Sequence, residues 1–186
     1  MRLYELKFEI DGNDKEKIIR AFGLEFFRQY SDTDYFLLSV DSKKEKYKEV
    51  DGRTILYALN FNSVTGMFEI DDEELTENFD RIDEVKKRKV SNIIKRTKDV
   101  YVWHRSSVRV AFDSIEGLDD KLFCEIYDKD EATVFEAKRK VVELGFTKFI
   151  DKTYDEFLKK SFSIVNIILV FIIIIVIGII AFYIFK

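Results

Sequence analysis

The chain of 186 residues contains no proline, one cysteine and one histidine. A single cysteine excludes an intramolecular disulfide framework, and a structural zinc site of Cys and His ligands is not expected. Neither sign of charge dominates, because 31 Lys and Arg stand against 35 Asp and Glu, for a net charge of −4. This balance gives no signal for a nucleic-acid partner. The length suffices for one sizeable hydrophobic core, so one soluble domain is expected.

Charged residues are absent from one long stretch near the C-terminus. Residues 165–185 read VNIILVFIIIIVIGIIAFYIF, and Asn166 is the only clearly polar side chain among them. As a helix, this stretch spans roughly 30 Å, which is enough to cross a bilayer core. Three lysines precede it and one follows, so the positive-inside rule places the N-terminal part in the cytoplasm. We therefore expect a soluble domain over residues 1–160 and a single-pass transmembrane helix over residues 163–185, a tail anchor in a lipid bilayer.

Residues 107–127 carry the clearest strand pattern. Apolar side chains alternate with polar ones over residues 108–113, which predicts a strand whose second face carries Arg109 and Asp113. A turn containing glycine then leads to a second strand that carries Glu125. The charged face of this hairpin either faces water or looks into a closed barrel.

Similar patterns predict the remaining elements. Strands are expected over residues 2–10, 25–30, 35–40, 54–61, 67–70 and 91–101, with a polar turn at 31–34, a charged connector at 41–49, an acidic loop with a weak helix at 71–84 and a solvated basic turn at 86–89. One helix is expected to begin at Asn13 or Asp14, and another at Asp130. The mixture favours an α+β fold with a shared antiparallel sheet.

Charged side chains share one face on four of the expected strands. They are Glu5, Lys7 and Glu9; Arg96 and Lys98; Arg109 and Asp113; and Glu125. If the helices cover the apolar faces, the charged faces meet inside a flattened barrel, where unpaired charge is costly. A polyanion with divalent cations would satisfy both signs, because Lys and Arg bind phosphoryl oxygens and carboxylates hold Mg²⁺.

These residues resemble the CYTH superfamily of triphosphate tunnel proteins, which includes class IV adenylate cyclases, thiamine triphosphatases and inorganic triphosphatases. The family opens with Glu-x-Glu-x-Lys, and LYELK at residues 3–7 matches its second Glu and its Lys. QYSDTDYF at 29–36 resembles a Gln-x-Asp-x-Tyr-Phe-like stretch, and KRTK at 95–98 matches a strand with two basic residues. VRVAFDSIEGL at 108–118 matches closely the family's arginine strand and the Val-Glu-Gly-Leu-Gly that follows it. FCEIY at 123–127 keeps the first Glu of Phe-x-Glu-x-Glu.

The resemblance covers roughly residues 2–158, and it has three departures. Leu3 stands where the family has its first Glu, and Tyr127 stands where it has the second Glu of the late pair. The region expected to carry an Arg-x-Arg strand and a Lys strand, residues 55–60 and 67–70, contains no basic residue. Some of the basic residues that bind phosphate in the family, and two of its metal ligands, are therefore expected to be missing.

The resemblance implies a fold, a ligand and roles for seven residues. The fold would be α+β, with a closed antiparallel β-barrel, the triphosphate tunnel, and flanking helices, to which the apolar stretch described above adds the C-terminal transmembrane helix. Lys7, Arg96, Lys98 and Arg109 would bind phosphate, and Glu5, Asp113 and Glu125 would hold Mg²⁺ or Mn²⁺.

Three functions stay open for the sequence. The first is a membrane-anchored, metal-dependent enzyme that hydrolyses a triphosphate-containing small molecule or polyphosphate, or an adenylate cyclase-like phosphoryl-transfer enzyme. The second is a non-catalytic module that binds a nucleotide or polyphosphate at the membrane. The third is a degenerate scaffold whose charges pair internally.

Overall fold

The computed structural model describes residues 1–38, 44–50, 53–75, 78–104, 106–118 and 121–158. The chain divides into two compact units, Met1–Asp151 and Lys152–Lys186. The elements of the first unit are β1 (Arg2–Ile10), α1 (Gly12–Phe22), β2 (Leu24–Leu37), β3 (Lys44–Val50), β4 (Arg53–Asn62), β5 (Met67–Glu74), α2 (Phe79–Lys87), β6 (Val90–Trp103), β7 (Arg109–Ile115), β8 (Leu122–Asp128) and α3 (Glu131–Glu143).

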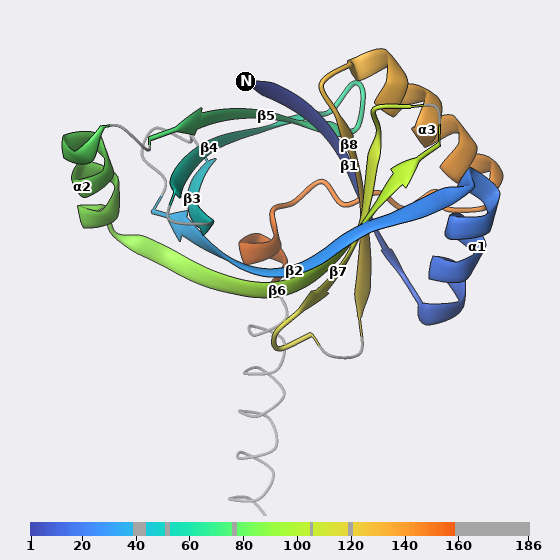
Figure 1. Ribbon diagram of the computed structural model, residues 1–186, viewed down its shortest axis with the longest axis horizontal. Coiled ribbons are helices and arrows are strands. Elements are labelled where there is room, and N and C mark those ends of the chain that lie inside the picture. Colours follow the sequence, from blue (N-terminus) through green and yellow to red (C-terminus); the bar gives the residue numbers. More distant parts are fainter. Residues whose placement is uncertain (39–43, 51–52, 76–77, 105, 119–120, 159–186) are drawn as a thin grey trace, which may run out of the picture. The chain divides into compact units, whose positions relative to one another are not determined.

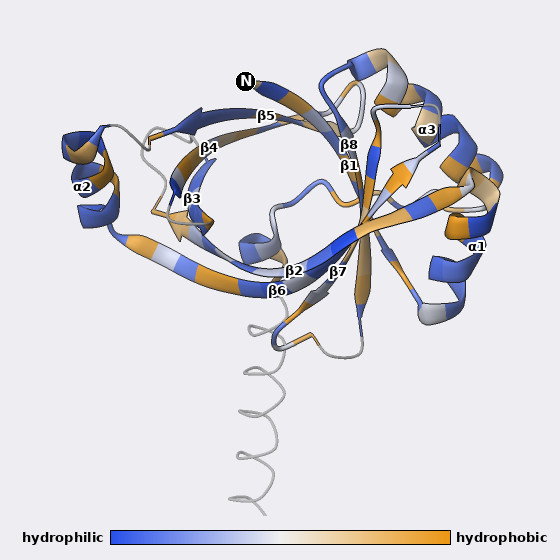
Figure 2. Ribbon diagram, viewed as in Figure 1, coloured by the Kyte–Doolittle hydropathy of each residue, from blue (hydrophilic) through white to orange (hydrophobic). Residues whose placement is uncertain are grey.

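The eight strands of the first unit close into a barrel in the order β1-β5-β4-β3-β2-β6-β7-β8 (Figure 1). Every neighbouring pair is antiparallel. Hydrophobic and hydrophilic residues alternate along several of the strands (Figure 2), as expected where successive side chains point to opposite faces of a sheet. This arrangement confirms the closed antiparallel barrel with flanking helices.

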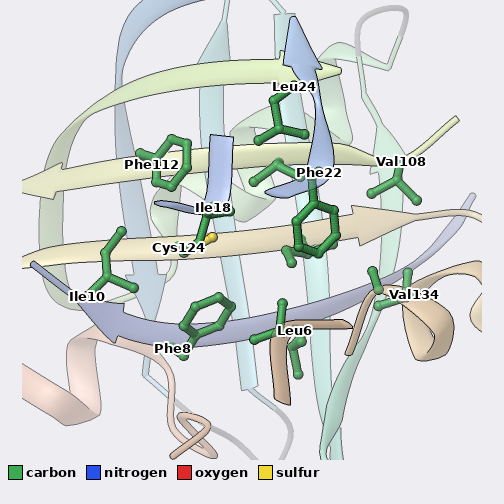
Figure 3. Close-up of a cluster of buried hydrophobic side chains, with 14 of the residues drawn as sticks. Leu6, Phe8, Ile10, Ile18, Phe22, Leu24, Val108, Phe112, Cys124 and Val134 are labelled. Atoms are coloured by element: carbon green, nitrogen blue, oxygen red, sulfur yellow. The ribbon is translucent and has the colours of Figure 1, made fainter. Parts of the chain in front are cut away.

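The main hydrophobic core lies outside the barrel, between its wall and two helices. α1 and α3 lie on the same side of the barrel, away from α2 (Figure 1). Leu6, Phe8 and Ile10 of β1 lie in one cluster with residues of β7, β8 and both helices (Figure 3). The buried members from those other elements are Ile18 and Phe22 of α1, Phe112 of β7, Cys124 and Ile126 of β8, and Val134, Ala137 and Val141 of α3. The apolar strand faces are thus covered by helices, which leaves the opposite faces to line the lumen.

A smaller core lies under α2. Val85 of this helix is buried against Tyr47 of β3 and Leu56 of β4. The stretch at 71–84, expected as an acidic loop with a weak helix, contains the end of β5 and most of α2, and the last turn of α2 carries Lys86 and Lys87 from the expected basic turn. Cations are favourable there because the C-terminal end of a helix carries partial negative charge.

Two expected loops are strands in the structure. β2 runs without a break through the expected turn at 31–34, because Asp32 and Asp34 stay in register with β6 and β3. The expected connector at 41–49 contains all of β3 except its last residue, and this strand pairs with both β2 and β4. At α1, Asp11 is the N-cap, and neither Asn13 nor Asp14 fills that position. The Asp11 side chain accepts a hydrogen bond from the Asp14 N–H at 2.8 Å.

Residues 152–158 are the described part of the second unit. The Thr153 hydroxyl donates a hydrogen bond to Asp155 at 2.5 Å, and its backbone N–H donates to Glu156 at 3.1 Å, at the start of a short helical turn over residues 154–158. Among the residues that the structure describes, no helix is long and apolar enough to cross a membrane. The transmembrane helix expected over residues 163–185 lies outside the described residues.

Candidate functional site

Ten charged side chains from six strands, all among the described residues, are joined by ion pairs inside the barrel lumen, and we call them the lumen network. They are Glu5 and Lys7 of β1, Asp32 and Asp34 of β2, Lys46 and Lys48 of β3, Arg96 and Lys98 of β6, Asp113 of β7 and Glu125 of β8. Five are cations and five are carboxylates, so the charges of the network balance when all are ionised. The charged face of the hairpin at residues 107–127 therefore looks into the lumen, since Asp113 is 0% and Glu125 is 1% exposed.

The strand register pairs opposite charges directly across four strand boundaries. The register partners are Lys7 with Glu125 between β1 and β8, Lys98 with Asp113 between β6 and β7, Arg96 with Asp32 between β6 and β2, and Lys48 with Asp34 between β3 and β2. Directly opposed residues are the closest side-chain neighbours in a sheet, so opposite charges there stabilise the pairing. Strand register alone therefore assembles most of the network.

Arg96 lies at the centre of the network and contacts four carboxylates. Its Nε donates to Asp32 at 2.8 Å, and its Nη1 donates to Asp113 at 2.9 Å and to Glu125 at 3.3 Å. Its Nη2 lies 3.2 Å from an Asp34 oxygen. The planar guanidinium has five N–H donors in a fixed fork, so it can serve several carboxylates at once where a lysine could not. Burial lowers the Arg96 pKa, but these carboxylates outweigh it and leave the pKa well above its ordinary value.

Two lysines extend the network toward β1 and β8. Lys98 donates a short hydrogen bond to Glu125 and lies 3.4 Å from Asp113. Lys7 lies 3.0 Å from Glu5 and 3.4 Å from Glu125. Glu125 thus lies beside three cations, Lys7, Lys98 and Arg96. Burial raises the pKa of Glu125, but these cations outweigh burial and hold the pKa well below its ordinary range.

The pKa of Asp113 is shifted in the opposite direction to that of Glu125. Burial and the neighbouring Glu125 charge raise the pKa of Asp113 to about 6, although Lys98 and Arg96 oppose this rise. One buried oxygen, Asp113 Oδ1, accepts no hydrogen bond within the described part of the chain. Asp113 is therefore the carboxyl of this pair that takes a proton first.

β3 supplies the two basic residues that the sequence did not predict. Lys48 lies 2.5 Å from Asp32, and Lys46 lies 2.8 Å from Asp34. Burial lowers the pKa of Lys46 to about 8 despite the Asp34 charge. The basic residues expected on the strands around residues 55–60 and 67–70 are absent there, but β3, directly before those strands, brings two lysines into the lumen.

Six of the seven predicted site residues lie together in the network, and one does not. Arg109 is half-buried, donates to the Ser107 carbonyl at 3.4 Å and stacks 5.4 Å from the Phe27 ring. Within the described residues it forms no ion pair with the network. Asp32, Asp34, Lys46 and Lys48 were missed. The signal that could have found them is the two-residue spacing of like charges, at 32 and 34 and again at 46 and 48.

The carboxylates of the network are the right ligand type for a hard divalent cation, but they are not arranged around a common point. Carboxylates are the ligands that Mg²⁺ and Mn²⁺ prefer, and Asp113 Oδ1 and Asp34 Oδ1 are buried without a hydrogen-bond donor in the described part. Yet no three Asp, Glu, His or Cys side chains among the described residues are arranged to hold a metal ion. A cation could bind only after the carboxylates leave some of their lysine and arginine partners.

Comparison with known proteins identifies the fold through solved structures. No family model matches the chain, and no curated protein is significantly similar in sequence. The PH1819 protein of Pyrococcus horikoshii shares 22% identity and a TM-score of 0.64, over 86% of this chain and 99% of that one. A candidate adenylate cyclase of Vibrio parahaemolyticus shares 14% identity and a TM-score of 0.60, over 84% and 97%. The Hippeastrum protein HpAC1 is a candidate adenylyl cyclase described with a dominant triphosphatase activity. It shares 10% identity and a TM-score of 0.51, over 82% of this chain and 91% of that one.

This chain therefore has the barrel fold of those proteins. The sequence resemblance implied the same fold, and the two observations agree on the closed barrel.

Removal of the central guanidinium tests the network. Arg96→Met should lower the free energy of unfolding by about 3–5 kcal/mol at pH 7, because four buried carboxylates lose their shared partner. The loss should shrink at pH 5, where protonation relieves the unpaired charges. Denaturant unfolding measures both values. Arg2→Met is the matched control, since Arg2 pairs with Asp71 on the surface, and it should have little effect. Equal effects of the two substitutions would contradict a central role for Arg96.

The pKa of Asp113 predicts a pH dependence of stability. Its folded-state pKa of about 6 exceeds its ordinary value of 3.8, so its contribution is fully present below about pH 4 and is lost as the pH rises through 6. Wild type should therefore lose up to about 3 kcal/mol relative to Asp113→Asn between pH 4 and pH 7. Denaturant unfolding across this range is the measurement.

Asp99→Asn is the control for the pH dependence. Although burial raises the Asp99 pKa, hydrogen bonds from Lys15 and Gln29 leave it lowered. Wild type should therefore gain stability relative to Asp99→Asn as the pH rises. A wild-type to Asp113→Asn difference that stays constant with pH would contradict the assignment.

Proposed function

We propose that the barrel lumen binds the phosphate chain of a triphosphate compound, as in the CYTH superfamily, and hydrolyses it with Mg²⁺ or Mn²⁺. One observation carries this proposal: ten charged side chains converge in the lumen of a closed eight-stranded barrel. The fold shared with the Vibrio and Hippeastrum proteins supports it, because both are described as candidate cyclases and one with a triphosphatase activity.

An eight-stranded barrel does not in general require a charged lumen in order to be stable. Side chains of any kind can fill an eight-stranded barrel, and apolar ones do so without desolvating ions. Each buried ion costs several kcal/mol before its partners offset it, and replacing buried ion pairs by apolar residues is often neutral or stabilising. A network of this size is therefore better explained by a ligand than by folding.

Phosphate oxygens would replace carboxylates as partners of the lumen cations. A cavity of about 120 Å³ touches Lys46, Lys48, Arg96 and Lys98. Lys and Arg are the residues that bind phosphoryl oxygens with charge-assisted hydrogen bonds. The carboxylates released in this exchange, with Asp113, Glu125 and Glu5 as candidates, would hold the divalent cation. When bound, that cation would polarise the phosphoryl group and neutralise its charge.

The charge balance of the network requires the ligand to bring its own cations. The five lumen cations are already offset by five carboxylates, so a bare triphosphate would bring excess negative charge into a buried site. Binding with divalent cations keeps the lumen close to neutral.

A second candidate function is binding without turnover. It is favoured by the observation that every lumen cation has a carboxylate oxygen within 3.0 Å. Carboxylates that keep these partners cannot also hold the divalent cation that hydrolysis needs, and no three of them among the described residues are arranged to do so.

Two lysines on β6 provide a matched test of binding. Lys98 lies in the lumen, whereas Lys95 lies outside and pairs with Glu116 at 3.5 Å. Lys98→Gln should weaken the binding of tripolyphosphate with Mg²⁺ to the full-length chain by roughly ten- to a hundredfold, because a charge-assisted hydrogen bond is worth about 1.5–3 kcal/mol. Lys95→Gln should bind as wild type. Calorimetry measures the affinities, and phosphate release measures turnover.

The outcomes separate the three functions. Hydrolysis predicts phosphate release that Asp113→Asn abolishes without abolishing binding. Binding without release in wild type would leave the non-catalytic module. The absence of binding for tripolyphosphate and for ATP would refute both and leave the scaffold.

We also propose that residues 163–185 anchor the chain in a membrane, with the barrel domain on the cytoplasmic side. The uninterrupted apolar stretch at 165–185 and the lysines before it support this proposal. A glycosylation site added after Lys186 should be modified when the chain is inserted into microsomes. Release of the full-length chain from membranes by alkaline carbonate would contradict the anchor.

A further inference from the structure

Two aromatic side chains lie exposed next to each other near the start of β2. Phe26 is 60% and Phe27 is 54% exposed. The pairing of β2 with β6 shifts register between Phe26 and Arg28, which makes Phe27 the extra residue of a β-bulge. Among the described residues, neither ring belongs to the two hydrophobic core clusters, so both present apolar surface to solvent.

Two arginines flank the Phe27 ring. The guanidinium carbon of Arg28 lies 5.5 Å from the ring centre, and that of Arg109 lies 5.4 Å from it. We call Phe26, Phe27, Arg28 and Arg109 the arginine–aromatic patch. A guanidinium that stacks on a ring keeps N–H donors free at its edge. Both arginines can therefore still bind an anion.

Within the described part of the chain, the arginines of the patch form no ion pair, in contrast to every cation of the lumen network. Arg109 donates to the Ser107 carbonyl at 3.4 Å. Glu25, the carboxylate nearest to Arg28 in sequence, lies 3.0 Å from His104 instead. Two guanidinium groups against one ring repel each other, so an anion that contacts both would be favourable.

Exposed rings beside arginines have the chemistry of a surface that contacts a lipid bilayer. Aromatic and apolar side chains enter the boundary between lipid headgroups and acyl chains, while arginines reach the lipid phosphates. Anionic lipids also attract cations near the surface of the bilayer. A soluble phosphate would use the arginines alone and would leave both rings in water.

The proposed membrane anchor would hold the barrel close to a bilayer. Residues 152–162 link the unit that contains the barrel to the helix expected over residues 163–185. Fully extended, this link spans at most roughly 40 Å, which is comparable to the diameter of a domain of this size. Some surface of the barrel would therefore meet the headgroups often. Because the net charge of the chain is −4, a surface that carries arginines without carboxylate partners suits anionic lipids better than the average surface does.

We propose that the arginine–aromatic patch docks the barrel on the surface of a bilayer that contains anionic phospholipids. Arg28 and Arg109 contact lipid phosphates, and the rings of Phe26 and Phe27 enter the headgroup region. This docking gives a role to Arg109, which lies apart from the lumen network. The inference rests on the proposed membrane anchor and is independent of the triphosphate function.

A fluorescent label beside the patch measures docking of the full-length chain in vesicles. Ser107→Cys offers an exposed site for the label two residues from Arg109, while the native Cys124 is buried and stays unlabelled. Brominated lipids should quench this label in vesicles of phosphatidylcholine with phosphatidylserine. In vesicles of phosphatidylcholine alone, the ratio of docked to undocked chain should be at least about fivefold lower. A label on Ser63→Cys, in the turn between β4 and β5, should stay unquenched in both.

Two matched pairs of substitutions in the labelled chain separate charge from ring. Arg28→Gln should lower the ratio of docked to undocked chain roughly fivefold, because it removes one cation from an anionic surface. Arg53→Gln removes an exposed charge of β4 and should change the ratio little. Phe27→Gln should lower the ratio about tenfold, because an apolar ring no longer leaves water. Phe79→Gln removes an exposed ring of α2 and should change it little.

The failures of docking and of the anchor differ. A chain that resists alkaline carbonate but keeps its Ser107→Cys label in water in both kinds of vesicle would overturn docking and leave the anchor. Equal quenching in both kinds of vesicle, or equal effects within either matched pair, would also overturn it. Reversal of the quenching by millimolar inorganic phosphate at constant ionic strength would assign the arginines to a soluble anion instead. Release of the chain by carbonate would overturn the anchor, and docking with it.

Discussion

The contact of Arg96 with four carboxylates is the interaction on which the rest of the structure depends. It joins β2, β7 and β8 to β6 through side chains as well as through backbone hydrogen bonds. Because the barrel interior is filled by charge, the hydrophobic core must lie elsewhere. It lies between the outer barrel wall and helices α1 and α3, with a smaller part under α2. The helices are therefore expected to contribute to stability, since they cover the apolar outer faces of the strands.

The same constraint explains how a lumen with ten charges can be stable and still suit a ligand. Cross-strand ion pairs satisfy the charges when no ligand is bound. A ligand would have to displace some of the carboxylates from these pairs in order to bind the lumen cations. A bound phosphate chain with its cations would exchange one set of ion pairs for another without changing the net charge.

The sequence predicted the faces of strands better than it predicted their limits. The alternation in residues 2–10 and 108–113 identified lumen residues correctly, because the pleat fixes which side chains share a face. It could not give their depth along the barrel, which is why Arg109 was grouped with residues from which it lies apart. Asp32 and Asp34 lay in a stretch with strong turn propensity, and tertiary pairing with Arg96 and Lys48 overrides that propensity. The lysines of β3 lay in the stretch at 41–49, which was interpreted as a charged connector.

Cys124 gives the molecule an intrinsic reporter. It is the only cysteine of the chain, it is fully buried beneath α1 and α3, and burial raises the pKa of its thiol. A thiol reagent can therefore reach it only when the helical layer separates from the barrel wall or the chain unfolds. The alkylation rate of the unmodified protein thus measures how often that layer opens, and a ligand that stabilises the lumen from the other side of the same wall would slow it.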